Sequence, residues 1–324
     1  MKLYVQIPCL NEEETLPDVL KSIPKKVDGF DSVEILIIND GSTDRTVEVA
    51  KNLGVKHFVH HRTNQGLSKS FTDGLDYALS HGADVIVNTD GDNQYPQADI
   101  PKLVKPILSG EAEIVIGDRQ TESISHFGPF KRSMQRFGSW VVNKAAKTDV
   151  PDTVSGFRAY SAEAALRMNV INSFSYCTET IVHAGRKRIA MTAVPVQTNP
   201  PTRKSRLFKN IWQHMYKSGV VIIKSYIMHE PLKVFIVPGI SLILVGLIPF
   251  VRYFVLILGS SHPGQHLQSL LLGVALLTAG LLFVVLGVIA DLIKTNRVIA
   301  ESNLELTKRS LYDLPEKSDS SKAK

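Results

Sequence analysis

The sequence predicts an α/β fold, in which helices cover both faces of a mainly parallel sheet, followed by amphipathic interface helices and a two-helix transmembrane hairpin. Three observations lead to this prediction. Short apolar or β-branched runs alternate with helix-like segments along the first part of the chain. The strand-like runs are apolar on both faces, which is typical of parallel strands covered on both sides. Residues 234–293 are almost free of charged side chains.

Each element of the soluble part has its own local signal. Strands are expected at the runs "KLYVQIP", "VEILIIND", "KHFVHH", "DVIVNTD", "AEIVIGD" and "IAMTAVPV". Helices are expected over residues 12–22, 42–53, 67–80, 100–109, 130–147 and 177–188. The stretch "DTVSGFRAYS" between the last two helices is rich in turn-forming residues, and we predict a turn there.

The apolar C-terminal region predicts two membrane spans. Residues 234–251 and 270–290 are each close to the ~20 apolar residues that cross a bilayer as a helix. The connector "LGSSHPGQHLQS" has no Lys or Arg, whereas Lys233 precedes the first span and Lys294 follows the second. Arg252 fits this pattern least well, but late in the first span it can snorkel to the far interface. The positive-inside rule therefore places the soluble domain and the C-terminus on the cytoplasmic side of a multi-pass membrane protein. The alternative, two buried core helices, is disfavoured because such helices normally have a polar face.

Four segments follow from this division of the 324 residues. Residues 1–206 form the soluble domain, and residues 207–232, in which aromatic side chains recur among lysines, form amphipathic helices on the membrane surface. A core helix is the alternative for this second segment. Residues 233–293 form the hairpin, and residues 294–324 form a partly disordered tail.

Composition excludes several classes of protein. The net charge is +6, but the chain has no basic helix with interleaved aromatic residues, so nucleic acid is not an expected partner. The basic clusters instead favour an anionic lipid surface. The dinucleotide fingerprint and the P-loop pattern are missing, as is an N-terminal secretory signal. The two cysteines, Cys9 and Cys177, are read as small apolar residues rather than as a metal site or a disulfide.

Polar loops follow the first four predicted strands. They are "PCLNEEE", "NDGSTD", "TNQG" and "TDGDNQ". In parallel sheets, ligands bind beyond the carboxyl ends of the strands, so these loops are expected to meet on one rim of the sheet.

The loop "TDGDNQYP" carries the clearest chemistry. In an extended segment, Asp90, Asp92 and Gln94 project from the same face. Two carboxylates that converge beyond a strand end repel one another unless a cation joins them, and oxygen ligands of this kind suit Mg²⁺ or Mn²⁺. The alternative is a plain turn, since Asp, Gly and Asn are favoured in turns.

Two other rim loops have weaker signals. "NDGSTD" places Asp40 beyond its strand, with Ser42 and Thr43 available to cap the next helix, an arrangement that suits the polar edges of a nucleotide. "NEEE" reads by itself as a solvated helix start, favoured by the helix dipole.

The ordered set of motifs resembles the inverting family 2 glycosyltransferases, and among them the polyprenyl-phosphate glycosyltransferases typified by dolichyl-phosphate mannose synthase. "IPCLNEEETL", "IINDGSTDRT", "NQGLSKSFTDGL", "DGDNQYP", "IGDRQ", "KRSMQRFGSWVVN", "DTVSGFRAYS" and "YCTETIVHAGRK" occur in the family order, across about residues 2–207. The chain departs from the family pattern at Gln135, where Ser is common, and in the shorter "TRKSR" at 202–206. The resemblance implies a GT-A-type catalytic domain.

The resemblance also implies a role for individual residues. The nucleotide would be bound by Pro8, Leu10, Asn11, Glu12, Asp40, Gly41 and Ser42. Mg²⁺ or Mn²⁺ would be held by Asp90, Asp92 and Gln94 on the diphosphate. The acceptor phosphate would meet Arg119, Arg132 and Arg136, while Arg203 and Arg206 would lie near the diphosphate. Asp92, Arg119 and Arg132 are the residues expected to take part in catalysis.

The function expected from these features is metal-dependent transfer of a hexose, with inversion, from a UDP- or GDP-linked sugar to a dolichyl or undecaprenyl phosphate in the membrane. Two alternatives stay open. A polysaccharide synthase shares the nucleotide-sugar loops, although the Gln-x-x-Arg-Trp motif of such enzymes is absent here. A catalytically silent membrane subunit that binds a nucleotide sugar is the other alternative. Two short spans also suggest a homo-oligomer.

Overall fold

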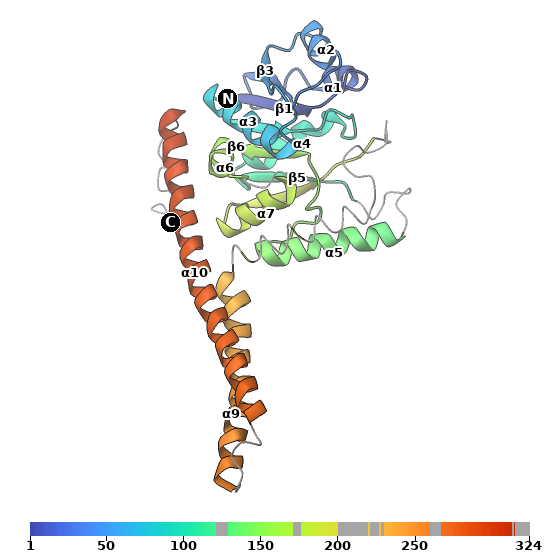
Figure 1. Ribbon diagram of the computed structural model, residues 1–324. Coiled ribbons are helices and arrows are strands. Elements are labelled where there is room, and N and C mark those ends of the chain that lie inside the picture. Colours follow the sequence, from blue (N-terminus) through green and yellow to red (C-terminus); the bar gives the residue numbers. More distant parts are fainter. Residues whose placement is uncertain are drawn as a thin grey trace. The chain divides into compact units, whose positions relative to one another are not determined.

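The computed structural model describes residues 1–120, 129–170, 176–199, 220, 227, 230–259, 267–312 and 314, with the side chains of 129–135, 137 and 257–259 left out. The chain divides into two compact units. The first comprises Met1–Ser218 together with Leu304–Lys324, and the second comprises Gly219–Asn303. The first unit is an α/β domain and the second consists of apolar helices (Figure 1).

The first unit contains a seven-stranded sheet with the order β3-β2-β1-β4-β6-β5-β7. The strands are β1 (Lys2–Cys9), β2 (Ser32–Asn39), β3 (His57–His60), β4 (Val85–Asn88), β5 (Ile114–Asp118), β6 (Arg158–Ser161) and β7 (Met191–Pro195). All pairs are parallel except those of β6, which runs antiparallel to both β4 and β5. The prediction of a mainly parallel sheet is thus confirmed, and every strand expected from the sequence is present.

The turn expected over "DTVSGFRAYS" is wrong for its last four residues, which form β6. This run is short, and its β-strand signal is weak next to the turn-forming residues before it. Its place between β4 and β5 gives it a pairing partner on each side. Ala159 and Tyr160 are fully buried there, so tertiary pairing outweighs the local turn preference.

Helices cover both faces of the sheet. The helices of this unit are α1 (Leu16–Ser22), α2 (Thr46–Asn52), α3 (Leu67–Ser80), α4 (Ile100–Leu108), α5 (Pro129–Ala146), α6 (Ala162–Arg167) and α7 (Tyr176–Arg186), with a 3₁₀ turn η1 (Gln97–Asp99). Leu3 and Val5 of β1 share one core cluster with α1, α2 and α4. On the other face, Phe71 of α3 stacks on Tyr176 of α7 with ring centroids 4.2 Å apart. Successive side chains of a strand point to opposite faces of the sheet. Both sets are apolar here because helices pack on both faces.

The last turns of α10 (Leu267–Leu311) also belong to the first unit. Lys308 pairs with Asp76 of α3 at 2.6 Å, and Arg309 pairs with Glu163 of α6 at 2.8 Å. Glu305 accepts a hydrogen bond from Lys187 at 3.3 Å. The segment expected to begin a tail at residue 294 is therefore helical through Leu311.

The second unit contains α9 (Pro231–Gly259) and the greater part of α10. Both helices are long and apolar enough to cross a membrane, and only 11% and 17% of their most apolar windows are buried in the protein. This exposure disfavours the alternative of two core helices. A Cβ atom on Gly280 would lie 2.7 Å from the carbonyl oxygen of Gly239, so the two helices touch through their glycine backbones. The interface helices expected over residues 207–232 lie outside the described residues, apart from 220, 227 and 230–232.

Candidate active site

The candidate site lies where β1, β2 and β4 end. These strands are parallel neighbours, so their carboxyl ends meet at one rim of the sheet. The loops 10–15, 40–45 and 89–96 follow them. The last residue pair between β1 and β4 is Gln6 with Asn88. Pro8 lies beyond this pair, near the end of β1, and is buried. The convergence expected from the sequence is present.

Asn11 joins the loops after β1 and β2. Its backbone N–H donates to Ser42 Oγ at 3.0 Å, and its side-chain oxygen accepts from the Thr43 backbone at 2.7 Å. Asn11 has a φ of 56°, the left-handed region that Asn tolerates better than most residues. The expected capping of α2 by Ser42 and Thr43 is wrong, because α2 begins only at Thr46, whose backbone N–H donates to Asp44 Oδ1 at 3.0 Å. The side chains of Ser42 and Thr43 instead fix the first two rim loops to each other.

Glu12 joins the same loop to the loop after β4. Its side chain is largely buried, so the reading of "NEEE" as a solvated helix start is wrong at this residue. The Glu12 backbone N–H donates to Thr46 Oγ1 at 2.8 Å, and its carbonyl accepts from Leu16. Thr15 Oγ1 lies within hydrogen-bonding distance of both Glu12 Oε2, at 2.9 Å, and the Gly91 carbonyl oxygen, at 2.7 Å. The bonds to Thr46 and Gly91 hold residues 12 and 15 to other loops, and α1 begins at Leu16 rather than at residue 12.

Asp40 and Gly41 bring the loop after β2 against the loop after β3. Asp40 accepts hydrogen bonds from His61 and from the backbone N–H groups of Gln65 and Gly66. Gly41 has a φ of 77°, and a Cβ atom there would lie 2.8 Å from the Asn64 backbone nitrogen. A side chain at position 41 would therefore force these two loops apart.

Asp90 and Asp92 lie in the loop after β4, and their carboxylates influence each other. Burial, reinforced by the charge of Asp92, raises the pKa of Asp90 to about 7, although the positive charge of Arg119 opposes the shift. The expectation that this segment is extended is wrong, because residues 91 and 92 form a turn and Asn93 has a φ of 59°. Even so, the two carboxylates are close enough to interact electrostatically.

The donor set fits a divalent cation. A buried carboxylate whose ionisation is opposed by a neighbouring carboxylate is stabilised when a cation binds both. Gln94 adds an amide oxygen, and its backbone N–H donates to Asp92 Oδ1 at 3.2 Å. In the described part of the chain, no three acidic, His or Cys side chains are grouped as a complete metal site. Phosphate oxygens of a substrate would have to complete the shell, as is usual for Mg²⁺.

The segment before β6 closes the site beneath Asp90. A Cβ atom on Gly156 would lie 3.1 Å from Asp90 Oδ2, so the backbone passes directly beside this carboxylate. The Gly156 N–H donates to the Tyr95 hydroxyl at 3.1 Å. The Gly156 carbonyl accepts a hydrogen bond from Asn88 Nδ2 at 2.9 Å. Residues far apart in the chain thus hold the position of Asp90.

Arg119, directly after β5, forms a bidentate ion pair with Asp152. Its Nε lies 2.6 Å from Oδ2 and its Nη2 lies 2.9 Å from Oδ1. Burial would raise the pKa of Asp152, but the hydrogen bond and charge of Arg119 outweigh it and hold this pKa below its usual value. The sequence provides no local signal for this pairing, because the two residues are separated by a helix.

A second buried arginine, Arg158 on β6, was not expected from the sequence. It is fully buried, and its guanidinium donates to the carbonyls of Ser155, Thr153 and Cys177 and to Thr180 Oγ1, at distances of 2.7–3.0 Å. Its charge lowers the pKa of Asp90, against the larger effect of burial. "DTVSGFRAYS" stood out as a motif, but the burial of its arginine depends on the sheet order.

Asn199, after β7, ties the chain to the loop that carries Asp92. Its backbone N–H donates to the Gln94 carbonyl at 2.9 Å, and its Nδ2 donates to the Asn93 carbonyl at 2.9 Å. Arg203 and Arg206, which follow Asn199 in the chain, lie outside the described residues. The structure describes the backbone of Arg132 on α5 but not its side chain, and Arg136 is exposed on the same helix.

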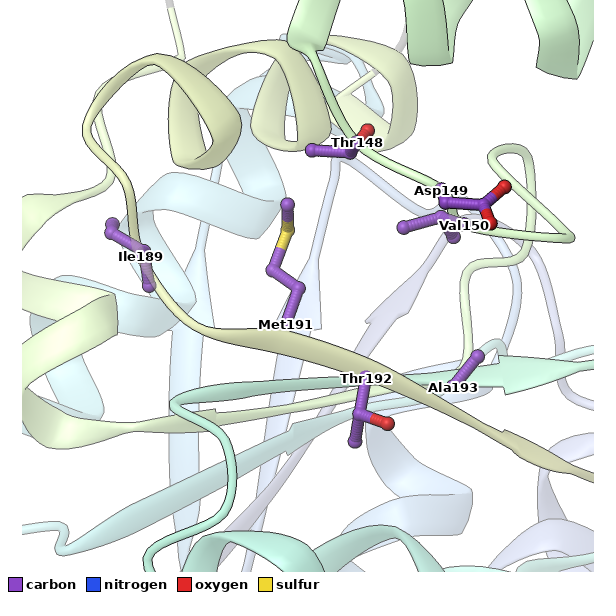
Figure 2. Close-up of a pocket in the computed structure, with 7 residues that line it drawn as sticks. All are labelled: Thr148, Asp149, Val150, Ile189, Met191, Thr192 and Ala193. Carbon is purple, nitrogen blue, oxygen red and sulfur yellow. The ribbon is translucent and has the colours of Figure 1, made fainter.

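A separate pocket of about 250 Å³ lies along β7 (Figure 2). Thr148, Asp149 and Val150 of the loop after α5 line one side, with Ile189 and the β7 residues Met191, Thr192 and Ala193 on the other. None of the expected site residues that the structure describes lines it. Among its described lining residues Asp149 is the one carboxylate, and it offers no metal or phosphate chemistry comparable to that of the rim.

Comparison with known proteins decides the family. Residues 4–167, about half of the chain, match the family described as glycosyl transferase family 2. The chain belongs to this family. The matched span contains the rim loops, the Asp90–Asp92 pair and the Arg119–Asp152 pair, so the site lies within the part of this family 2 glycosyltransferase that defines its membership.

Two curated relatives of this family 2 glycosyltransferase are similar over about half of the chain or more. One is the UDP-N-acetylglucosamine–dolichyl-phosphate N-acetylglucosaminyltransferase of Methanococcus voltae, 26% identical over 221 residues, which covers 60% of this chain and 85% of the relative. Another is the dolichol-phosphate mannosyltransferase of Pyrococcus furiosus, 34% identical over 171 residues, with coverage of 50% and 47%.

A solved structure confirms the GT-A-type fold. Glucosyl-3-phosphoglycerate synthase from Mycobacterium tuberculosis, in complex with Mn²⁺, UDP and phosphoglyceric acid, superimposes with a TM-score of 0.54 at 20% identity. The match covers 70% of this chain and 77% of the other. The fold and the family expected from the sequence motifs are therefore both confirmed.

Proposed function

We propose that this family 2 glycosyltransferase transfers a hexose from a UDP- or GDP-linked sugar to a polyprenyl phosphate in the membrane. The observation that carries the proposal is the carboxylate pair Asp90 and Asp92 at the rim, where the pKa of Asp90 is raised to about 7. Two carboxylates that repel each other in a buried site are suited to a divalent cation, and the bound cation would in turn attract a negatively charged diphosphate. The loops that meet there contain the residues expected to bind the nucleotide.

The donor would lie across the rim loops. Pro8, Leu10, Asn11 and Glu12 would line the base and ribose, together with Asp40, Gly41 and Ser42. Asp90, Asp92 and Gln94 would hold Mg²⁺ or Mn²⁺, which when bound offsets the charge that develops on the departing diphosphate. The hydrogen bonds from Thr15 and Asn199 would keep the loop of Asp92 in place during the reaction.

The acceptor would be bound by arginines. Arg119 would meet the phosphate while Asp152 fixes its guanidinium plane, and Arg132 and Arg136 would add charge from α5. A phosphate oxygen is already anionic near neutral pH, so no strong general base is needed for attack at the anomeric carbon. In-line attack would invert the configuration of that carbon.

Two features support a lipid acceptor. The relatives from Methanococcus voltae and Pyrococcus furiosus are named for dolichyl-phosphate or dolichol-phosphate chemistry. The apolar helices α9 and α10 would anchor an enzyme with a water-soluble donor beside its lipid acceptor. Basic residues flank the hairpin and are missing from its connector, which favours a cytoplasmic catalytic domain and C-terminus.

The chain would be organised in four segments. Residues 1–206 would form the catalytic domain, 207–232 the interface helices, 233–293 the two spans and 294–324 the cytoplasmic C-terminal segment. Arg203 and Arg206 would lie near the diphosphate, since Asn199, just before them in the chain, is hydrogen-bonded to the loop that carries Asp92. The protein would form homo-oligomers through its short hairpin.

Transfer of radiolabel tests the proposal. Membranes that contain the full chain would be incubated with labelled UDP- and GDP-sugars, undecaprenyl or dolichyl phosphate, and Mg²⁺, Mn²⁺ or EDTA. We expect metal-dependent, mild-acid-labile label in the organic extract from one donor, and none with EDTA or without the lipid. If folded protein labels neither lipid from any donor, the proposal is wrong, and a silent subunit or a polysaccharide synthase becomes the better explanation.

A further inference from the structure

A buried histidine links the rim of the sheet to α3. Nδ1 of His61 lies 2.7 Å from Oδ1 of Asp40, and Nε2 lies 2.9 Å from Oδ2 of Asp73. The His61 side chain is 8% exposed and that of Asp40 is 7% exposed. Each ring nitrogen of His61 is therefore within hydrogen-bonding distance of one carboxylate oxygen. A continuous hydrogen-bonded chain therefore runs from the end of β2 to α3.

Asp40 receives two further hydrogen bonds from the loop before α3. The Gln65 N–H donates to Oδ1 at 2.7 Å, and the Gly66 N–H donates to Oδ2 at 3.0 Å. A carboxylate offers about four acceptor positions. Within the described part of the chain, Oδ1 thus accepts two donors and Oδ2 accepts one. One position on Oδ2 is left for a ligand.

Both oxygens of Asp40 are held by neighbours. The Gln65 N–H and His61 Nδ1 contact Oδ1, and the Gly66 N–H contacts Oδ2, so the carboxylate is held from the loop before α3 and by the His61 ring. Asp73 prevents the ring from turning, and Lys69 pairs with Asp73 one helical turn away.

We propose that His61 and Asp73 are positioning residues for the nucleotide base: they hold Asp40 so that its remaining acceptor position meets a single ring N–H of the base. This inference rests on the proposed function, in which Asp40 binds the base of the donor. Uracil and guanine each have one ring N–H on the edge that faces a partner base. Cytosine and adenine have an acceptor nitrogen at the equivalent position, which Asp40 would repel.

Binding to the purified full chain in detergent tests this role. The probes are UDP, GDP and inorganic pyrophosphate, each with Mn²⁺, measured by calorimetry. The variants are His61→Gln and Asp73→Asn. The Asp73 side chain is more exposed than that of His61, so we expect its substitution to disturb folding less. The matched control is His57→Gln, because His57 is another histidine that contacts α3, from β3 through the Tyr77 hydroxyl at 3.1 Å.

We expect each His61 and Asp73 variant to weaken the binding of UDP or GDP about tenfold, the effect of one lost hydrogen bond to a charged group. Pyrophosphate binding should stay unchanged, because the base is not involved, and the His57 control should behave like the wild type. With acceptor present, the donor KM should rise while kcat at saturating donor stays the same.

Three results would overturn the inference in distinguishable ways. Wild-type protein that binds neither UDP nor GDP would overturn the proposed function, and this inference with it. Wild-type binding of UDP or GDP that is unchanged in both variants would overturn the inference alone. Equal weakening of nucleotide and pyrophosphate binding would show a general effect on folding or on the site, and would also overturn the positioning role.

Discussion

Arg119 and Asp152 hold each other through two short hydrogen bonds, from Nε to Oδ2 at 2.6 Å and from Nη2 to Oδ1 at 2.9 Å. The Asp152 carboxylate also accepts the N–H groups of Val154 and Ser155. The plane of the arginine is therefore fixed from the segment before β6. An arginine with a preset plane binds a phosphate with less loss of side-chain entropy than a mobile one.

Removal of Asp152 should destabilise the protein. Asp152→Asn leaves the Arg119 guanidinium without its carboxylate in a largely buried site, and breaking a buried ion pair in this way costs about 3 kcal/mol of unfolding free energy. Thermal unfolding of the full chain in detergent measures this. Asp149→Asn, an exposed carboxylate in the same segment, is the control and should change little. Equal stability of both variants would show that the pair contributes nothing.

Acid should weaken the same interaction. The pKa of Asp152 is held below its usual value in the folded protein, so the unfolded chain takes up the proton first as the pH falls. The contribution of Asp152 is complete above the ordinary aspartate pKa of about 3.9. This stabilising contribution is lost as the pH falls through the lower pKa that Asp152 has in the folded protein. The melting temperature of the wild type should therefore drop more between about pH 6 and pH 3 than that of Asp152→Asn. Parallel curves would contradict this.

Loss of one candidate metal ligand should abolish transfer without unfolding. Loss of a residue that only hydrogen-bonds to a metal ligand lowers metal affinity about 10–100-fold. Asp92 would bind the metal itself, so we expect Asp92→Asn to reduce metal-dependent transfer by more than about a hundredfold. Electron paramagnetic resonance of free Mn²⁺ would report the lost binding independently of activity. Asp18→Asn, an exposed carboxylate on α1, is the control. Near-normal turnover in folded Asp92→Asn protein would refute the metal assignment.

Arg132 should affect the acceptor rather than the donor. Arg132→Ala removes a charge from α5, so we expect the KM for polyprenyl phosphate to rise about tenfold, as for one lost charged hydrogen bond. The Kd for the nucleotide sugar should stay near the wild-type value. Lys144→Ala on the same helix, where Lys144 lies 5.0 Å from the Trp140 ring, controls for loss of charge alone. Equal losses of donor and acceptor binding would exclude a role specific to the acceptor.

The glycine contact of the apolar helices should tolerate no side chain. Valine at position 280 would place its Cβ against the Gly239 carbonyl, and overpacking of this kind costs about 1–3 kcal/mol. We expect Gly280→Val to lower the melting temperature and to expose the hairpin to protease. Ala275→Val, at an exposed position on α10, should do neither. If the two variants are equally stable, the glycine contact does not hold the helices together.

The sequence predicted most of the elements because their signals are local. The apolar runs of β1 and β4 and the helical spacing of α3 can be read within a few residues. The starts of α1 and α2 could not be predicted, because Glu12 and Ser42 are held by partners more than thirty residues away. β6 was missed for a similar reason, since its strand form depends on two neighbours in the sheet.

The candidate site divides in the same way. Asp90 and Asp92 could be recognised from their spacing and from their place after a buried run. Their turn conformation could not, because Asn199 and Thr15, from distant segments, bind the carbonyls of that loop. The roles of Asp152 and Arg158 were hidden for the same reason.

By itself, the sequence determined the parallel sheet, the family and the two apolar helices, because strand and helix periodicity, motif order and hydrophobicity are properties of neighbouring residues. Only the tertiary structure decided how Arg119 is oriented, which acceptor position of Asp40 is left for a ligand, and where Asn199 binds the loop of Asp92. Each of these depends on a hydrogen bond between residues far apart in the chain, and such partners become neighbours only when the sheet has formed.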